Sequence, residues 1–171
     1  KTKTDTEVIL RMYEQYGIKS IEMIKGMFAF CLIDMKNDIT WIARDRFGIK
    51  PLIYYLDDEK FIFGSTIDAV KKSFDACPEF DDYSVYLYMM MSYVPTPRTI
   101  YKNIYKLKPG NQIVINKKQV EISEYWNADI FDQTSELFDK DIFYEHMKDI
   151  VDSHLISEKP LGTFLSGGLD S

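Results

Sequence analysis

The stretch GMFAFCLIDMKNDITWIARDRFGIKPLIYYLDDEKFIFGS, residues 26–65, decides the fold of the first part of the chain. Apolar, aromatic and β-branched residues occur here in short runs separated by polar turns, which is the pattern of two β-hairpins. Residues 26–35 and 38–45 form the first predicted hairpin, and 51–56 and 60–65 form the second. Alternation is weak over 26–35, so we expect both faces of that strand to be covered.

Helical patterns flank this region. Apolar residues at helical spacing predict an amphipathic helix over residues 4–17, with Thr4 and Glu7 as a capping box and Gly17 as its stop. Residues 19–25 predict a second, short helix. Because the helical and the strand periods both occur, we predict an α+β fold with helices packed on antiparallel sheet.

Four further elements are expected before residue 127. Residues 65–73 predict a short helix, and residues 81–93 predict a longer one that is rich in tyrosine and methionine. The longer helix is apolar nearly all round, which favours burial between layers or domains. Residues 94–110 form a proline-punctuated crossing, and residues 111–126 form a hairpin.

The polar, aperiodic stretch 127–135 is the predicted linker. It divides the chain into a domain over residues 1–126 and the start of another over 136–171. A helix is predicted over residues 137–156, and a buried strand is predicted over 163–165, before a glycine turn. Four apolar side chains of that helix are expected to face inward: Phe143, Met147, Ile150 and Val151.

Composition and charge bound the function. With 46% hydrophobic and 28% charged residues the chain is ordinary globular material, and its net charge of −6 disfavours nucleic acid as a partner. No apolar run is long enough to span a membrane. Cys31 and Cys77 have no metal-ligand spacing and fit a reducing cytoplasm, and the pair His146 and His154 favours no metal site. The chain begins without methionine, and we expect it to be a piece of a longer protein.

Five stretches occur in an order that resembles glutamine-dependent asparagine synthetases: TDTEVIL (4–10), GMFAFCLID (26–34), ARDRFGIKPLIYY (43–55), VPTPRTIYKNIYKLKPG (94–110) and SGGLDS (166–171). The resemblance covers nearly the whole chain. It implies the later part of a class II glutaminase domain with the N-terminal-nucleophile fold, followed by the opening of an α/β ATP-pyrophosphatase domain.

The resemblance also implies the reaction. Glutamine would supply ammonia in the first domain, aspartate would be adenylated by ATP in the second, and ammonia would displace AMP in a cytoplasmic enzyme that is a homodimer at full length. Two alternatives remain. One is a relative that amidates another carboxylate, such as a sugar acid, or closes a β-lactam. The other is a non-catalytic fragment or binding module, which is our expectation for the isolated chain.

The motif SGGLDS suits an anion. Gly167 and Gly168 let the backbone bend so that successive N–H groups point at one anion, and Ser166 and Ser171 add hydroxyl donors. The alternative is an ordinary Gly-Gly turn with a serine cap. The resemblance implies an ATP pyrophosphate site, with Asp170 acting through Mg²⁺, over these residues: Leu165, Ser166, Gly167, Gly168, Leu169, Asp170 and Ser171.

Asp5 is the second candidate. If Thr4 and Glu7 form the capping box, Asp5 occupies the first helical position and its side chain is not needed for the cap. The alternative is an acidic residue placed to suit the helix dipole. The resemblance implies that Asp5 holds the α-amino group of glutamine.

The nucleophile of class II glutaminases is an N-terminal cysteine whose own α-amino group serves as base. Lys1 occupies that place here, Cys31 lies inside a predicted strand, and Cys77 precedes Pro78. We therefore expect no catalytic residue in this chain.

The loop RDRFGIKPL is interpreted as architecture. Arg44, Asp45 and Arg46 are expected to hold it by charge-assisted hydrogen bonds, with Gly48 and Pro51 setting the turn.

Overall fold

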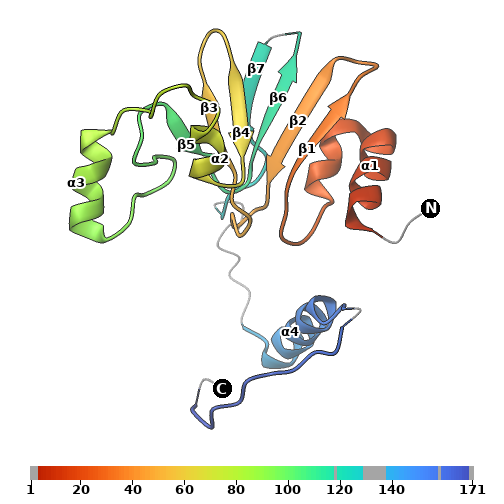
Figure 1. The fold of residues 1–171 in the computed structure, drawn as a ribbon. Coiled ribbons are helices and arrows are strands. Elements are labelled where there is room, and N and C mark those ends of the chain that lie inside the picture. The colour runs from red at the N-terminus through yellow and green to blue at the C-terminus, as the bar shows by residue number, and fades with distance from the viewer. Residues whose placement is uncertain (1–3, 118, 129–137, 158, 170–171) are drawn as a thin grey trace. The chain divides into compact units, whose positions relative to one another are not determined.

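The computed structural model describes residues 4–117, 119–128, 138–157 and 159–169 (Figure 1). The chain divides into two compact units, Lys1–Ile130 and Phe131–Ser171. Most of the predicted linker, at residues 129–135, lies outside the described residues.

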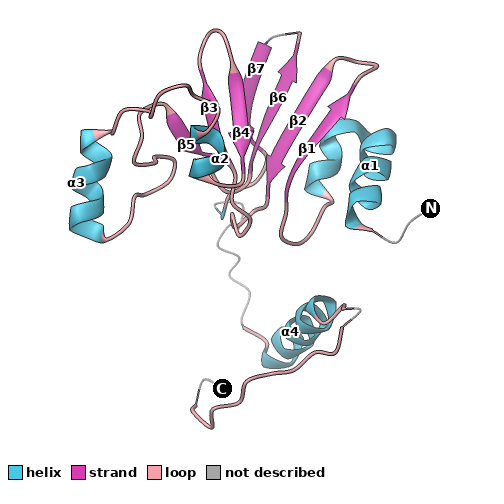
Figure 2. Cartoon of the chain, viewed as in Figure 1, coloured by secondary structure: helices cyan, strands magenta, loops and turns pink. Residues whose placement is uncertain are grey.

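The first unit contains two antiparallel sheets (Figure 2). The larger sheet has the order β1-β2-β6-β7, and its strands are Ala29–Asp34 (β1), Ile39–Arg44 (β2), Asn111–Asn116 (β6) and Gln119–Glu124 (β7). The smaller sheet has the order β4-β3-β5, and its strands are Ile53–Leu56 (β3), Phe61–Gly64 (β4) and Ile104–Lys106 (β5). The predicted hairpins and the antiparallel α+β architecture are confirmed.

Four helical elements accompany the sheets: Asp5–Tyr16 (α1), Gly17–Glu22 (η1), Ile67–Lys71 (α2) and Asp82–Met91 (α3). The Thr4 hydroxyl accepts the Glu7 N–H at 3.4 Å, and Gly17 ends α1 with φ +62°. The helix predicted over 19–25 is instead the 3₁₀ helix η1, which begins earlier. A tight 3₁₀ turn commonly follows where a glycine ends an α-helix.

The core lies between four layers: α1 with η1, the larger sheet, the smaller sheet, and α2. Trp41 of β2 is fully buried and packs under α1 and η1. Its neighbour Ile42 points the opposite way and packs with Ile113 against the smaller sheet. Val70 of α2 covers the far face of that sheet with Ile53. Strand β2 is therefore the strand buried on both faces.

The expectation that residues 26–35 form a strand covered on both faces is wrong for β1. Cys31 is exposed and the side chain of Ile33 is 63% exposed. The reason is the sheet order, because β1 lies at the edge and the packing between the two sheets reaches only Ala29 on that face.

Helix α3 also departs from its prediction. Ser84 is its buried residue, and the tyrosine and methionine side chains around the rest of the helix are exposed. Because Ser84 is the one buried residue of α3, the predicted burial between layers is not found.

The second unit contains one helix, Lys140–His154 (α4), among its described residues, shorter than the predicted 137–156. Asp139 caps it, since its carboxylate accepts the N–H groups of Asp141 at 2.9 Å and Ile142 at 3.1 Å. No residue of α4 is buried, so the inward-facing prediction is wrong in this unit: Phe143, Met147, Ile150 and Val151 are all exposed.

The strand predicted over residues 163–165 is absent from the described part of this unit, and Leu165 is 78% exposed. A buried strand needs neighbouring strands to satisfy its backbone, and the described residues 138–157 and 159–169 contain none. The described helices of both units also include none that is long and apolar enough to cross a membrane.

Candidate functional site

A surface cavity of about 330 Å³ lies beside the start of α1. Asp5 and Thr6 of α1 line it together with Phe28 from the entry to β1 and with Lys50 and Pro51 from the loop between β2 and β3. The predicted position of Asp5 at a helix start is confirmed, and the structure adds the loop residues to the same cavity.

The Asp5 carboxylate is exposed and only partly engaged. Its Oδ1 accepts the Thr6 N–H at 2.8 Å and lies 3.4 Å from the Thr6 hydroxyl. No residue in the described part of the chain donates to Oδ2. The N-cap hydroxyl is that of Thr4, which accepts the Glu7 N–H. The carboxylate is therefore available to a cation that enters the cavity.

The loop 45–50 is held by a buried carboxylate. Asp45 is 1% exposed, and its two oxygens accept the backbone N–H groups of Phe47 at 3.2 Å, Ile49 at 3.0 Å and Lys50 at 2.9 Å. Several N–H donors converging on one carboxylate fix the backbone, and such charge-assisted bonds are the strong ones. Lys50 is thereby placed at the cavity.

The two neighbouring arginines tie this loop to other elements. Arg44 donates to the carbonyl oxygens of Lys50 at 2.8 Å and Gly48 at 2.7 Å, and also to that of Leu107. Desolvation by burial lowers the pKa of Arg44. Arg46 donates to two carbonyl oxygens at the end of η1 and just beyond it. The loop is architecture, as the sequence predicts.

Tyr125 closes the network from the end of β7. Its hydroxyl donates to the Arg44 carbonyl oxygen at 2.7 Å. Burial raises the pKa of this phenol to about 12. The loop, β2 and the chain after β7 therefore share one set of hydrogen bonds.

The two cysteines lie on different elements of the first unit. Cys31 lies on β1, and desolvation raises the pKa of its thiol, which disfavours the reactive thiolate. Cys77 lies in the connection between α2 and α3.

The glycine turn of the second unit is only partly described, because Asp170 and Ser171 lie outside the described residues. Gly167 adopts φ +75°, and a side chain there would meet nothing within 4 Å. The Gly168 N–H donates to the Ser166 hydroxyl at 3.3 Å, which is the bond expected of a serine cap. The open left-handed bend fits an approaching phosphate, and the geometry also fits an ordinary capped turn.

The sequence reasoning missed the cavity walls. Phe28, Lys50 and Pro51 belong to stretches that were read for their family resemblance or as architecture. The GIKP segment directly after the polar RDR run was the available signal, since shaped loops often carry binding residues. Among described residues, no group of three or more histidine, cysteine or acidic side chains is arranged to hold a metal ion.

Comparison with known proteins assigns both parts of the chain. The family model of the glutamine amidotransferase domain matches residues 1–126, and that of asparagine synthase matches residues 143–171. The four layers of the first unit fit the N-terminal-nucleophile type of fold.

Three relatives illustrate the likeness. A Methanocaldococcus jannaschii protein that bears the name asparagine synthetase [glutamine-hydrolyzing] 2 is 36% identical over 100% of this chain, and asparagine synthetase B [glutamine-hydrolyzing] of Escherichia coli is 32% identical over 100% of it. Amidase chry2 of Gibberella zeae is 29% identical over 98%. The chain spans 34%, 26% and 25% of these proteins' lengths. It belongs to the glutamine amidotransferase domain family, and its likeness to glutamine-hydrolysing asparagine synthetases is confirmed.

Proposed function

We propose that this chain is part of an ATP-dependent asparagine synthetase that takes its nitrogen from glutamine. The observation that carries the proposal is the accessible Asp5 carboxylate at the mouth of a cavity, in a chain that belongs to the glutamine amidotransferase domain family.

Asp5 would bind the α-amino group of glutamine. Its Oδ2 has no donor among the described residues, and a carboxylate–ammonium hydrogen bond is the strong, charge-assisted kind. Oδ1 is held by the Thr6 N–H, so the carboxylate is oriented before the ligand arrives. The apolar wall at Phe28 and Pro51 would pack against the methylene groups of the ligand. We assign no residue of this chain to the chemical step.

The second part of the proposal concerns ATP. The residues Leu165 to Ser171 would hold its pyrophosphate through backbone N–H groups at the open glycine bend, and Asp170 would bind Mg²⁺. The nucleotide supplies the activation of the acceptor carboxylate, which we propose to be that of aspartate, in the cytoplasm. The match of residues 143–171 to asparagine synthase supports this assignment.

A second candidate differs in the acceptor. One relative carries the name amidase and not asparagine synthetase, so relatives of this chain do not all bear the name of one activity. On that alternative Asp5 keeps its role, because the acceptor does not enter the glutamine cavity. The assay below therefore includes acids other than aspartate.

The test is Asp5→Asn in the natural-length protein, assayed for ATP-dependent amide formation with glutamine or with ammonium chloride. Because a hydrogen bond to a charged group contributes about 1.5–3 kcal/mol, kcat/KM for glutamine should fall about 10- to 150-fold. The rate with ammonium should not change. Glu14→Gln, an exposed change on the same helix, is the matched control and should leave both rates unchanged.

Two outcomes contradict the proposal. An equal loss with glutamine and with ammonium would make Asp5 a structural residue. If no amide of aspartate forms with either nitrogen source while another acid is amidated, the acceptor is wrong and the second candidate is correct.

A further inference from the structure

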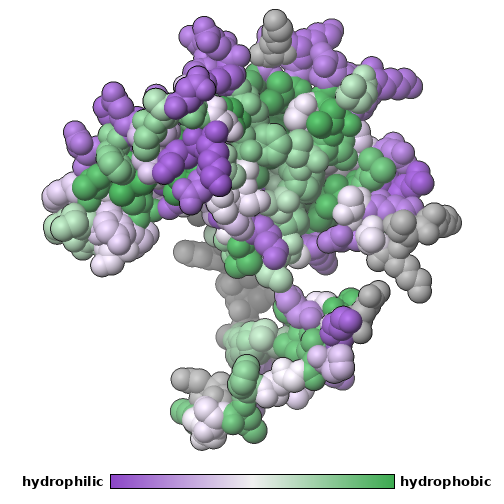
Figure 3. Space-filling model, in the orientation of Figure 1, coloured by the Kyte–Doolittle hydropathy of each residue, from purple (hydrophilic) through white to green (hydrophobic). Residues whose placement is uncertain are grey.

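Helix α3 presents an apolar face to solvent. The face consists of four side chains of the helix and one that follows its C-cap, with exposed fractions from 55% to 77%: Tyr83, Tyr86, Met89, Met90 and Tyr93. We call this set the α3 outer face. Figure 3 shows apolar residues gathered at the surface over this helix. Contiguous exposed apolar side chains of this kind mark interaction sites in soluble proteins.

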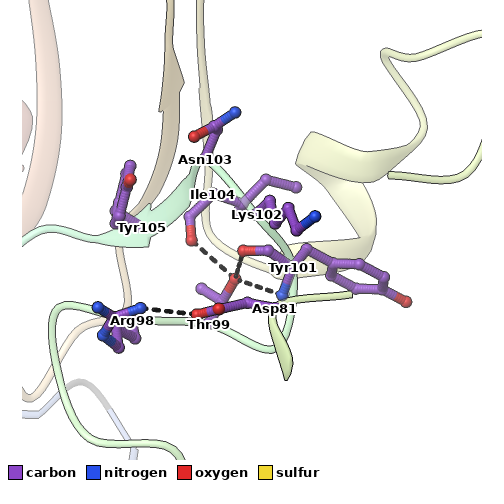
Figure 4. Close-up of a pocket in the computed structure, with 8 residues that line it drawn as sticks. All are labelled: Asp81, Arg98, Thr99, Tyr101, Lys102, Asn103, Ile104 and Tyr105. Carbon is purple, nitrogen blue, oxygen red and sulfur yellow. Dashed lines mark hydrogen bonds and ion pairs between the residues drawn. The ribbon is translucent and has the colours of Figure 1, made fainter. Parts of the chain in front are cut away.

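The residue before this helix is tied to the chain that follows it, and Figure 4 shows the Asp81–Arg98 ion pair and the hydrogen bonds of Thr99. The Asp81 carboxylate accepts the Ser84 hydroxyl at 2.6 Å and the Arg98 guanidinium at 2.7 Å. The buried Thr99 hydroxyl donates to the Ile104 carbonyl oxygen at 2.7 Å and so fixes the chain after α3. The cavity of about 220 Å³ between these residues has its main polar groups bonded to one another, which favours an anchor over a ligand site.

Arg98, which pairs with Asp81, also contacts the α3 outer face. The Arg98 guanidinium lies 5.0 Å from the centre of the Tyr83 ring, and the rings of Tyr83 and Tyr86 are stacked with centres 6.4 Å apart. The tyrosines are thus pre-ordered. Methionine adapts its shape to a partner, and tyrosine and methionine are both enriched in the buried centres of protein interfaces.

The area of this face argues against a second copy of the chain as the partner. A ten-residue helix is about 15 Å long, so a partner on one side of it covers roughly half of the ~800 Å² per partner that a stable complex between separate molecules needs. A partner in the same polypeptide needs less area, because the link supplies an effective concentration in the millimolar range.

The lengths of the relatives provide such a partner. This chain spans 25–34% of the three relatives compared above, and its match to asparagine synthase begins at residue 143. The described residues of the second unit bury no side chain of α4, so they do not by themselves make the core of a synthetase module. We propose that the α3 outer face docks against the synthetase module of the same polypeptide, through the part of that module that extends beyond residue 171. This inference rests on the proposed function for the identity of the module.

The test compares methionine oxidation by hydrogen peroxide, followed by peptide mass spectrometry, in the 171-residue chain and in the natural-length protein. Met89 should oxidise about fivefold or more slowly in the natural-length protein, because a covered thioether is shielded from the oxidant. Met35, 88% exposed in the turn after β1, is the internal control and should oxidise equally in both.

A variant separates docking from folding. Met90→Glu adds a charge to the outer face at a 67% exposed position, so the unfolding midpoint of the 171-residue chain should not change. In the natural-length protein the same variant should raise the oxidation rate of Met89 to that of the short chain. Met35→Glu is the matched control and should leave Met89 protected.

Equal oxidation of Met89 in the two lengths of the protein would overturn the inference. Protection that increases with protein concentration would also overturn it, because a second copy would then be the partner. Amide formation from aspartate is measured separately. If amide forms from aspartate and Met89 is unprotected, the proposed function stands and the docking proposal fails. If Met89 is protected but no amide forms from aspartate, the docking proposal stands and aspartate is rejected as the acceptor.

Discussion

Asp45 is the acceptor that three backbone N–H groups of the loop 45–50 share, and Asp45→Asn tests how far the first unit depends on it. Asparagine has nearly the same volume, but its amide nitrogen donates and cannot accept. Oδ1 can keep the N–H groups of Phe47 and Ile49, and the amide nitrogen then faces the Lys50 N–H at the present 2.9 Å. One charge-assisted bond is lost and a buried donor is left without an acceptor.

The expected cost is about 3 kcal/mol, from a hydrogen bond to a charged group at about 1.5–3 kcal/mol and the desolvation of the orphaned N–H. Asp45→Ala removes all three bonds and should cost about 4 kcal/mol or more. Domains of this size are stable by about 5–15 kcal/mol, so either loss is a large fraction of the total.

Urea unfolding followed by tryptophan fluorescence measures this loss. Trp41 is fully buried and Trp126 packs against Phe47 of the loop, with ring centres 5.2 Å apart, so both indoles report the event. A slope of about 2 kcal/mol per molar urea places the midpoint of Asp45→Asn about 1.5 M below that of the parent chain.

The control for this experiment is Asp38→Asn. Asp38 is exposed in the turn between β1 and β2, with φ +55°, a conformation that asparagine tolerates as well as aspartate does. Its midpoint should stay within the equivalent of about 0.5 kcal/mol of the parent. If Asp45→Asn and Asp38→Asn unfold at the same urea concentration, the shared carboxylate does not hold the loop and the argument from its burial is refuted.

Two further predictions concern the same unit. Gly110→Ala should lower the free energy of unfolding by about 3 kcal/mol or more, since Gly110 has φ +65° and a Cβ there would lie 2.1 Å from the Trp126 carbonyl oxygen. Gly17→Ala is the control. Gly17 has φ +62° with nothing within 4 Å of a Cβ, so the change should cost only about 1–2 kcal/mol in the same urea assay. The pKa of Tyr125 is raised from 10.0 to about 12 in the folded state, so its contribution to stability is fully present below pH 10 and is lost as the pH rises toward 12. Tyr125→Phe should therefore make the urea midpoint fall less steeply with pH over that range. An equally steep fall in the variant would contradict the raised pKa.

Local interactions explain what the sequence predicted well. Helix α1 lies where its period places it, since its start depends on the Thr4 hydroxyl three residues from the Glu7 N–H and its end on the left-handed Gly17. The hairpins likewise depend on short turns and on alternation within single strands. Such signals are contained in windows of a few residues and can be read without the tertiary fold.

Short stretches of sequence do not determine the order of the strands in a sheet. The runs at β1 and β2 are similarly apolar, and the sequence favoured β1 as the strand covered on both faces. The choice is made by β6, which pairs Ile113 with Ile42 across 71 positions of the chain and so makes β2 central. A pattern of period two identifies a strand but does not say what lies beside it.

The sequence identifies three apolar segments correctly, but the prediction of their burial was wrong. These segments are α3, α4 and residues 163–165. Amphipathic or wholly apolar periodicity indicates that a surface is to be covered. It does not say by which residues, and the described parts of the chain supply no cover for these three segments. Such a pattern predicts that the surface contacts a partner, but not which one. The α3 outer face is the exposed apolar surface that we propose contacts such a partner, and its helix is held in place by the hydrogen bonds of Asp81.

The cavity beside the start of α1 depends on both a local helix start and a loop that is held by long-range hydrogen bonds. Asp5 owes its position to a local helix start, whereas Lys50 and Pro51 reach the same cavity only because Asp45 and Arg44 fix the loop that carries them. The loop supplies no reacting group, and its hydrogen bonds end on backbone atoms. Its sequence is nevertheless constrained, because the shape of the cavity depends on those bonds. The stretch RDRFGIKPL therefore contributes Lys50 and Pro51 to one wall of the cavity, and Asp5 presents a negative charge to the same cavity.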